Sequence, residues 1–262
     1  MTLLPGTAVP PPPPAALLRV ENLSKRFGGL QAVDNVSFEL AAGQMLALIG
    51  PNGAGKSTTF NLLNGQIAPD QGHIRLANID LAGLSPREIG RQGVGRTFQT
   101  AAVFGSFSVL ENIQIALLAR DRRLFSFWRK AQGYRTDEAM DLLAQVGMQD
   151  SAGRLCGVLA YGDIKRVELA IALAGRPRLL LMDEPAAGMT APERHALMAL
   201  VRRLADERDM AILFTEHSLD VVFAHANSIV VLAQGRIIAA GTPGEIRTHE
   251  GVRSAYLGST RV

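Results

Sequence analysis

The sequence contains a single cysteine, Cys156, among 262 residues. One thiol excludes an intramolecular disulfide framework and is typical of a reducing compartment. Long hydrophobic runs are missing as well. The apolar segments Met45–Ile49 and Leu179–Met182 fall far short of the roughly 20 apolar residues that cross a bilayer. We therefore expect any membrane role of this chain to depend on partner subunits.

An excess of charge of one sign is also lacking. The formal net charge is +3, and no block of lysine and arginine is dense enough to form a nucleic-acid-binding tract. We therefore expect no nucleic-acid partner. What the sequence does have is 47% hydrophobic and 19% charged residues, the balance of a folded α/β protein, and enough length to bury a substantial core.

The amino-terminal segment, residues 1–16, differs from the rest of the chain. It contains the run Pro10–Pro14 and lacks a basic start followed by an apolar core. This composition predicts a disordered, polyproline-like tail and argues against a secretory signal. No repeat at a fixed period follows it, so we expect residues 17–258 to form one domain.

Short apolar segments alternate with helical patterns along the chain. The expected strands are Leu17–Val20, Val36–Leu40, Met45–Ile49, a strand-rich piece over His73–Leu81, Leu179–Met182 and Ala211–Thr215. The expected helices are Lys56–Leu63, a helical section from about Ser108 to Ala174, and Pro192–Leu204. This alternation predicts a mainly parallel sheet with helices on both faces. A closing hairpin is expected over Ser228–Leu232 and Arg236–Ala240.

A glycine-rich segment between an expected strand and an expected helix carries the clearest chemical signal. It consists of Gly50, Pro51, Asn52, Gly53, Ala54, Gly55, Lys56, Ser57 and Thr58. This segment fits the phosphate-loop pattern, in which glycines let successive backbone N–H groups face phosphate oxygens. Lys56 would neutralise the β- and γ-phosphates, and the Ser57 hydroxyl would bind Mg²⁺. The alternative, a glycine turn with a chance lysine, is disfavoured by the flanking strand and helix.

Two carboxylates, Asp183 and Glu184, follow the apolar run Leu179–Met182. Ligands bind at the carboxyl edge of such sheets. We expect Asp183 to hold Mg²⁺ through its water shell and Glu184 to orient or deprotonate an attacking water. The alternative is that both are helix-capping or turn carboxylates, an interpretation that the accompanying phosphate loop weakens. ATP and Mg²⁺ are thus the predicted ligands.

The order of the motifs resembles that of ABC ATPases. The matching features, in chain order, are the phosphate loop, Gln99 in Gly95–Gln99, the segment Leu159–Asp163, the pair Asp183 and Glu184, and His217. The resemblance spans about Leu17–Gly258. It implies an α/β fold with a RecA-like P-loop NTPase core, an antiparallel β-subdomain and an inserted α-helical subdomain over about residues 99–175.

The resemblance also implies roles for residues outside the phosphate loop. Gln99 would contact Mg²⁺ and water and relay the nucleotide state to membrane subunits. His217 would contact the γ-phosphate, and Phe27 would stack on adenine. Taken singly, these residues also fit ordinary roles: a solvated glutamine, a structural histidine and a core aromatic. The order of the motifs favours the functional interpretation, whereas the other four histidines fall in no motif and are expected to be structural.

The segment Leu159–Asp163 departs from the Leu-Ser-Gly-Gly-Gln that is common in the family. By resemblance, four of its residues would face the ATP of an opposing subunit; they are Ala160, Tyr161, Gly162 and Asp163. Anion binding at a helix amino terminus relies on backbone N–H groups, so Gly162 can serve without a serine hydroxyl. Asp163 either caps the helix toward solvent or lowers the affinity for ATP by repelling phosphate. Thr190 stands where the family's D-loop usually has Asp or Asn.

Within the family, the chain resembles the larger ATPase of branched-chain amino-acid importers. The matching features are Leu159–Gly162, Val167–Ala170, Asp183–Gly188, Gly241–Ile246, Ala255–Gly258 and the extra length over Arg120–Gly133. The ATPase of lipopolysaccharide export and those of urea or short-amide importers share several of these features and remain alternatives. A non-transport ABC ATPase and a regulatory module that holds ATP without hydrolysing it are rivals from other classes.

The resemblance implies an assembly at the cytoplasmic face of the inner (plasma) membrane, with this chain bound peripherally. The expected partners are two transmembrane permease subunits, a second ABC ATPase in a head-to-tail heterodimer or homodimer, and, indirectly, a solute-binding protein. The segment Arg122–Lys130 mixes aromatic and basic residues. It either contacts a permease loop or lipid headgroups or, as we favour, forms an amphipathic surface on the chain's own helical subdomain.

Overall fold

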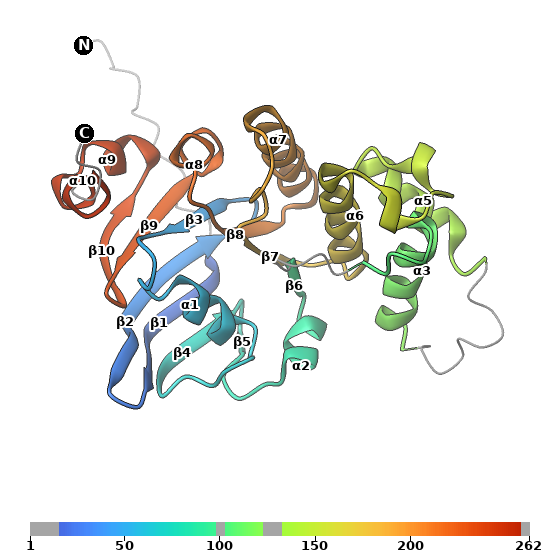
Figure 1. Ribbon diagram of the computed structural model, residues 1–262. Helices are drawn as coiled ribbons and strands as arrows, with labels where there is room; N and C mark the ends of the chain where they lie inside the picture. The colour runs from blue at the N-terminus through green and yellow to red at the C-terminus, as the bar shows by residue number, and fades with distance from the viewer. Residues whose placement is uncertain (1–15, 98–102, 123–132, 258–262) are drawn as a thin grey trace, which may run out of the picture.

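The computed structural model describes residues 16–97, 103–122 and 133–257, and its strands form two sheets (Figure 1). The antiparallel sheet has the order β2-β1-β4-β5 and consists of β1 (Ala16–Phe27), β2 (Leu30–Ala41), β4 (Gln71–Leu76) and β5 (Ile79–Asp80). The larger sheet has the order β10-β9-β3-β8-β7-β6 and consists of β3 (Met45–Ile49), β6 (Val94–Thr97), β7 (Leu179–Asp183), β8 (Ala211–Thr215), β9 (Ser228–Ala233) and β10 (Arg236–Gly241).

Helices flank these sheets. They are α1 (Lys56–Leu63), α2 (Pro86–Arg91), α3 (Val109–Arg120), α5 (Thr136–Gln145), α6 (Tyr161–Ala174), α7 (Ala191–Arg208), α8 (Leu219–His225), α9 (Pro243–Thr248) and α10 (Glu250–Leu257). Within the described ranges, no helix combines the length and the apolar character that spanning a membrane requires. The arrangement confirms the predicted α/β class.

The larger sheet is buried on both faces, as its apolar strands predict. β3, β7 and β8 pair in parallel, and every residue of these strands is buried. Successive side chains of a strand point to opposite faces of its sheet. In β3, Met45, Ala47 and Ile49 accordingly belong to one core cluster, whereas Leu46 and Leu48 belong to another. Burial on both faces explains why these strands are continuous apolar runs.

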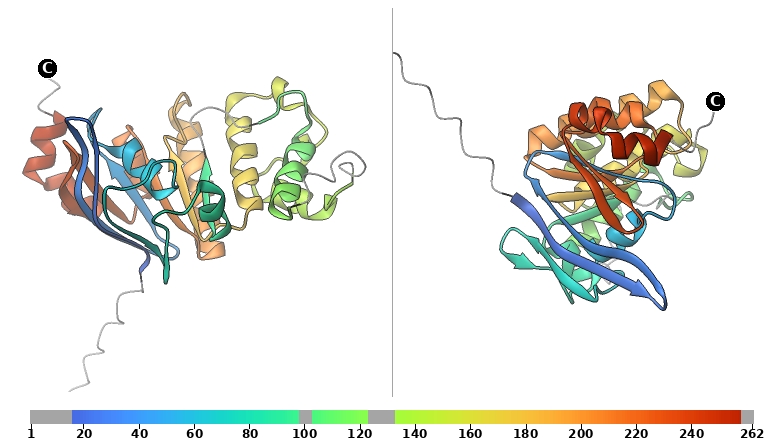
Figure 2. Two further views of the ribbon diagram at one scale, coloured as in Figure 1. Left: turned by 90° about the horizontal axis from the view of Figure 1, so that it is seen from below. Right: turned by 90° about the vertical axis from the view of Figure 1, so that its left-hand side faces the viewer.

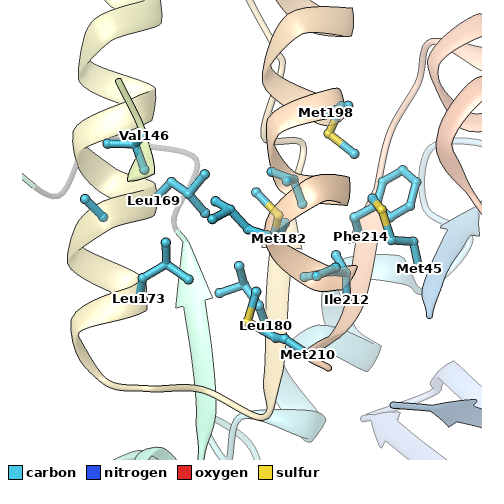
Figure 3. Close-up of a cluster of buried hydrophobic side chains, with 14 of the residues drawn as sticks. Met45, Val146, Leu169, Leu173, Leu180, Met182, Met198, Met210, Ile212 and Phe214 are labelled. Carbon is cyan, nitrogen blue, oxygen red and sulfur yellow. The ribbon is translucent and has the colours of Figure 1, made fainter. Parts of the chain in front are cut away.

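One core lies between the larger sheet and the helices α6, α7 and α8. Figure 3 shows Leu169 and Leu173 of α6 directed toward Leu180 and Met182 of β7, with Met198 of α7 above the sheet. Side chains of α3 and α5 belong to the same cluster. The helical part of the molecule is therefore packed continuously with the strand that ends in Asp183.

The second core lies on the other face of the larger sheet, where α1 and the antiparallel sheet cover it. Phe60, Leu62 and Leu63 of α1 are buried there. This packing fixes the orientation of α1. Its first residue, Lys56, consequently lies just beyond the carboxyl end of β3.

The helices α3, α5 and α6 lie together at the end of the molecule that is remote from the antiparallel sheet (Figure 2). A charged network holds them. The Glu138 carboxylate of α5 accepts hydrogen bonds from Arg120 (2.7 and 3.0 Å), Arg135 (2.9 Å) and Arg176 (2.9 Å). The hydrogen bond from Arg120, together with those from Arg176 and Arg135, lowers the pKa of Glu138 to about 2. Glu138 thereby joins α3 and α5 to the turn that follows α6.

Capping residues explain where several helices begin. In α2, the Ser85 side chain accepts a hydrogen bond from the Glu88 N–H while the Glu88 carboxylate accepts one from the Ser85 N–H. The same reciprocal capping box starts α3 at Ser108 and α9 at Thr242. Thr190 is the N-cap of α7, and both its N–H and its hydroxyl donate to Glu193. These local bonds fix where the helices begin, and they matter most for the six-residue helices α2 and α9, which the apolar pattern alone does not predict.

The structure has a strand or helix at each predicted place, but several bounds differ: β1 extends to Phe27, β2 already begins at Leu30, and the predicted helical section is divided into α3, α5 and α6. Three elements have the predicted bounds: Met45–Ile49, Lys56–Leu63 and Ala211–Thr215. β1 begins at Ala16, one residue inside the predicted tail, because Ala16 pairs with Ala41. β6 is absent from the predicted strands, since Gly95 and Arg96 interrupt its apolar pattern, and it is a strand because it pairs with β7. Residues 1–15 and 123–132 lie outside the described residues.

Candidate active site

The glycine-rich segment 50–58 forms the turn between β3 and α1. Gly55 is the N-cap of α1 and has a left-handed backbone, with φ of 103°. A Cβ atom at Gly55 would lie 2.4 Å from the carbonyl oxygen of Ala32, and one at Gly50 would lie 2.2 Å from that of Leu232. Both positions therefore require glycine. The first N–H groups of a helix have no partner within it, so this turn offers donors for an anion at the edge of the larger sheet.

The ammonium group of Lys56 is held against the same turn. Its Nζ donates hydrogen bonds to the carbonyl oxygens of Gly50 (2.6 Å) and Pro51 (3.1 Å), and the residue is buried. Burial lowers the pKa of Lys56, while the negative charges of Glu184 and Asp183 oppose that shift. The two carboxylates therefore favour the charged ammonium that phosphate binding requires.

A cavity of about 560 Å³ lies over the phosphate loop. Residues 52–58 form part of its wall, and Phe27, Glu184, His217 and Gln234 also line it. Phe27 is 48% exposed and lines the cavity, so this aromatic is not part of the core and is available to stack on a planar ring. The structure thus brings three sequence-predicted residues, Phe27, Glu184 and His217, to one cavity with the loop.

Asp183 is buried at the carboxyl end of β7 and is held from two sides. Its Oδ1 accepts a hydrogen bond of 2.8 Å from the hydroxyl of Thr215 in β8, and that hydroxyl accepts one of 3.0 Å from the N–H of Glu184. Its Oδ2 lies 3.5 Å from Nη2 of Arg96 in β6. This arrangement fixes the carboxylate at the sheet edge, where its oxygen atoms suit a hard cation such as Mg²⁺.

Glu184 follows β7 in a left-handed conformation, with φ of 48°. Such a conformation in a residue other than glycine costs about 1–3 kcal/mol and is concentrated at functional sites. Its Oε1 lies 2.7 Å from Nε2 of His217, the second residue after β8. Glu184 is largely buried, whereas about half of the His217 side chain is exposed. The pair combines a carboxylate that can accept a proton with an imidazole that can face a ligand.

Glu216 is a further carboxylate at this edge of the sheet, and it is not among the residues that line the cavity. It is buried and accepts hydrogen bonds from the backbone N–H groups of Ala186 (3.1 Å) and His217 (3.3 Å). Burial raises the pKa of Glu216, and its backbone hydrogen bonds only partly oppose that shift. Glu216 therefore links the loop that follows Glu184 to the backbone of His217.

The predicted signature residues lie elsewhere. Ala160 is the N-cap of α6 and makes no side-chain cap hydrogen bond, and Tyr161, Gly162 and Asp163 form the first turn. Among the described residues, the lining of the cavity does not include these four. Asp163 is partly exposed. Gln99 lies outside the described residues, so its contact with the metal and water remains a prediction.

Sequence reasoning misses Arg96, Thr215, Glu216 and Gln234. Thr215 and Glu216 could have been found from their positions: Thr215 ends the strand Ala211–Thr215, and Glu216 follows it directly before His217, at the edge where β7 places its carboxylates. Arg96 had a weaker one, its position within the Gly95–Gln99 motif. The histidines expected to be structural include His195, whose Nδ1 lies 3.2 Å from Nε2 of His225, outside the cavity lining.

Comparisons with known proteins agree with this geometry. A family model described as ABC transporter matches residues 33–187, and one described as branched-chain amino acid ATP-binding cassette transporter matches residues 236–261. The chain is similar to the high-affinity branched-chain amino acid transport ATP-binding protein LivG of Salmonella typhimurium (41% identity, covering 92% of this chain and 98% of LivG). It is also similar to the protein of that description named BraF from Pseudomonas aeruginosa (38% identity, 92% and 98%).

Two further similarities bear on fold and function. The lipopolysaccharide export system ATP-binding protein LptB of Escherichia coli is 33% identical, with 93% of this chain and 98% of LptB covered. A crystal structure of the ADP conformation of an ATP-binding cassette of an ABC transporter has a TM-score of 0.85 and 31% identity, with 94% of this chain and 100% of that chain covered.

Proposed function

The chain belongs to the ATP-binding proteins of ABC transporters, and we propose that it hydrolyses ATP to drive the import of branched-chain amino acids through separate permease subunits. The observation that carries this proposal is the contact between Glu184 and His217 beside the phosphate loop. The names of LivG and BraF, which share about two fifths of their residues with this chain, support the choice of solute.

The phosphate loop binds the triphosphate through the backbone N–H groups of residues 52–58 and the ammonium group of Lys56. Ser57, Gln99 and Asp183 would hold Mg²⁺, which supplies positive charge against the β- and γ-phosphate oxygens. The fit of Asp183 to this ion is supported by its fixed carboxylate, whose Oδ1 is oriented by Thr215. Phe27 stacks on the adenine ring.

Glu184 orients the attacking water and accepts its proton, and His217 contacts the γ-phosphate. The short contact between Glu184 Oε1 and His217 Nε2 keeps both groups at the same end of the nucleotide. Because Glu184 is largely enclosed, its carboxylate acts in a region from which bulk water is partly excluded. General-base catalysis of this kind contributes about 10²–10⁴-fold to a rate.

Two such ATPases pair head to tail, so that the segment 160–163 of one completes the cavity of the other. This arrangement accounts for the absence of residues 160–163 from the lining of the cavity in their own chain. We further propose a helical subdomain over about residues 99–175, a second and distinct ATPase as the partner, two permease subunits and, indirectly, a solute-binding protein. The pair would lie at the cytoplasmic face of the membrane.

The test is reconstitution of the chain with its cognate permeases, ATPase partner and binding protein in vesicles. We expect ATP-dependent uptake of radiolabelled leucine, and its loss in the matched complex that carries Lys56→Ala. Uptake of urea instead of leucine would assign the chain to the amide importers. Export of lipopolysaccharide, for which the similarity to LptB is the specific ground, would contradict import altogether. A wild-type complex that binds ATP without hydrolysing it would point to a regulatory module.

A further inference from the structure

Glu216 is an unusual group to bury at the edge of the larger sheet. Only 4% of the residue is exposed, and in the part of the chain that the structure describes it forms no ion pair. Its hydrogen-bond partners there are backbone N–H groups. A buried carboxylate without a cation is unfavourable for folding, because hydrogen bonds only partly replace its hydration. Its presence therefore calls for an explanation beyond the stability of the fold.

Two of the N–H groups that Glu216 binds belong to the two segments that carry the Glu184–His217 pair. Ala186 lies two residues after Glu184 in the β7–α7 loop (residues 184–190), and the second N–H is that of His217 itself. One carboxylate thus spans the gap between the loops that follow β7 and β8. The length of this bridge limits how far the side chains of Glu184 and His217 can separate.

The β7–α7 loop is also in contact with the amino terminus of α6. A Cβ atom built on Gly188 would lie 3.6 Å from Cε1 of Tyr161, and one built on Gly162 would lie 3.5 Å from Cε of Met189. Met189 is itself 8% exposed and packs with Ala186 in a small apolar cluster. A displacement of the first turn of α6 therefore meets this loop directly.

We propose that Glu216 is a positioning residue that ties the β7–α7 loop to His217 and so transmits the position of the α6 amino terminus to the Glu184–His217 pair. This inference rests on the proposed function, because only in a head-to-tail pair does α6 contact the nucleotide of the opposing subunit. Glu216 then reports the state of the opposing cavity to the catalytic pair of its own chain.

The first test is Glu216→Gln in the complete transporter complex, with the ATPase rate and nucleotide binding measured separately. Glutamine keeps the volume and one acceptor oxygen but puts an amide donor against one of the two N–H groups. We expect kcat to fall about ten- to a hundredfold, since small displacements of catalytic groups have effects of that size. KM and the Kd for ATP should stay within about twofold, because Glu216 does not line the cavity.

The matched control is Glu193→Gln. This change weakens the capping box at Thr190, the other end of the same loop, where the Glu193 carboxylate accepts from the Thr190 N–H and hydroxyl. It should lower the melting temperature and leave kcat within about twofold. A kcat of Glu216→Gln within twofold of wild type would overturn the proposal. A fall in kcat that is matched by equal losses of ATP binding or by unfolding would assign Glu216 to structure alone and also overturn it.

The link to α6 is tested by combining Glu216→Gln with Met189→Ala, which removes the side chain facing Gly162. If the loop transmits the position of α6 through Glu216, the double variant should be as active as the less active of the two single variants. If instead the two substitutions reduce kcat independently, so that their fold-losses multiply, the proposed link between α6 and Glu216 would be wrong. A wild-type complex that fails to hydrolyse ATP would instead contradict the proposed function, a result that these variants do not produce.

Discussion

The imidazole Nε2 of His217 lies 2.7 Å from the carboxylate Oε1 of Glu184. These residues are 33 positions apart and become neighbours because Asp183 pairs with Thr215 at the carboxyl ends of β7 and β8. A residue expected to activate water is thereby in contact with one expected to bind the γ-phosphate. The register of two parallel strands, and not any local motif, creates this contact.

Replacement of Glu184 by Gln should retain ATP binding and reduce hydrolysis by about 10²–10⁴-fold, because the amide cannot accept the proton of the attacking water. Single-turnover ATPase measurements on the complex, together with the Kd for ATP, check this. Glu207→Gln is the matched control, since Glu207 belongs to an exposed ion pair with Arg203 on α7. Hydrolysis at more than a tenth of the wild-type rate would contradict the role given to Glu184.

Thr215→Val should destabilise the site through an unmade hydrogen bond. Valine matches the shape of threonine but leaves Asp183 Oδ1 and the Glu184 N–H without the hydroxyl that joins them. We expect unfolding free energy to fall by about 1–3 kcal/mol. Calorimetry should then show a melting temperature about 2–10 °C lower. Thr215→Ser keeps the hydroxyl and should therefore keep most of the stability that Thr215→Val loses. Equal losses of unfolding free energy in the two variants would refute this account.

Gly55→Ala should abolish ATP binding, because the added methyl group would lie 2.4 Å from the Ala32 carbonyl oxygen and the backbone has φ of 103°. Gly53→Ala provides the control within the same loop. Gly53 has φ of 78° and no atom within 4 Å of its added Cβ, so the change should lower the free energy of unfolding by only about 1–2 kcal/mol and leave ATP binding measurable. Titration with a fluorescent ATP analogue distinguishes the two variants, and similar affinities would show that the steric argument fails.

Asp163→Gln should leave the KM for ATP within about twofold of wild type. Asp163 lies in the first turn of α6, where a carboxylate stabilises the helix by about 0.3–1 kcal/mol through the helix dipole. The ATPase rate of the paired complex, measured against ATP concentration, is the check. A several-fold gain in apparent affinity would favour the other interpretation, in which Asp163 repels the phosphates of the opposing subunit.

Glu138→Gln should weaken the helical part of the molecule, because three arginines donate to this carboxylate. The pKa of Glu138 is lowered to about 2 in the folded protein, so the stabilisation is present above the ordinary glutamate pKa of about 4.5 and is lost as pH falls from there toward 2. The variant should unfold more easily than wild type at pH 7, by about 1–2 kcal/mol, and the difference should shrink in that acidic range. A difference in unfolding free energy between the variant and wild type that stays constant across pH would refute the role given to the Glu138 carboxylate.

Much of the phosphate-binding half of the site follows from the sequence. Glycines at positions 50, 53 and 55, followed at once by Lys56, permit a backbone that is unfavourable for other residues, and the strand before them and the helix after them are visible as local patterns. Asp183 and Glu184 are recognisable because an apolar strand ends in two carboxylates. These signals are local, since each depends on residues that are close in the chain.

The catalytic half depends on contacts between distant segments. Thr215 becomes an orienting group for Asp183 only because β7 and β8 are adjacent in the sheet, and Arg96 approaches Asp183 only because β6 pairs with β7. The position of Glu216 before His217 marks it as close to the site, but only packing shows that it is enclosed against the N–H of Ala186. No periodicity encodes such contacts.

The sequence by itself determined the phosphate loop, the buried parallel strands and the α/β class. The backbone freedom of glycine and the apolar runs of buried strands both depend on residues that are adjacent in the chain. Only the tertiary structure decided which side chains surround Asp183 and how Glu184 meets His217. Strand order and register set those distances, and both result from the packing of the whole sheet between its two cores.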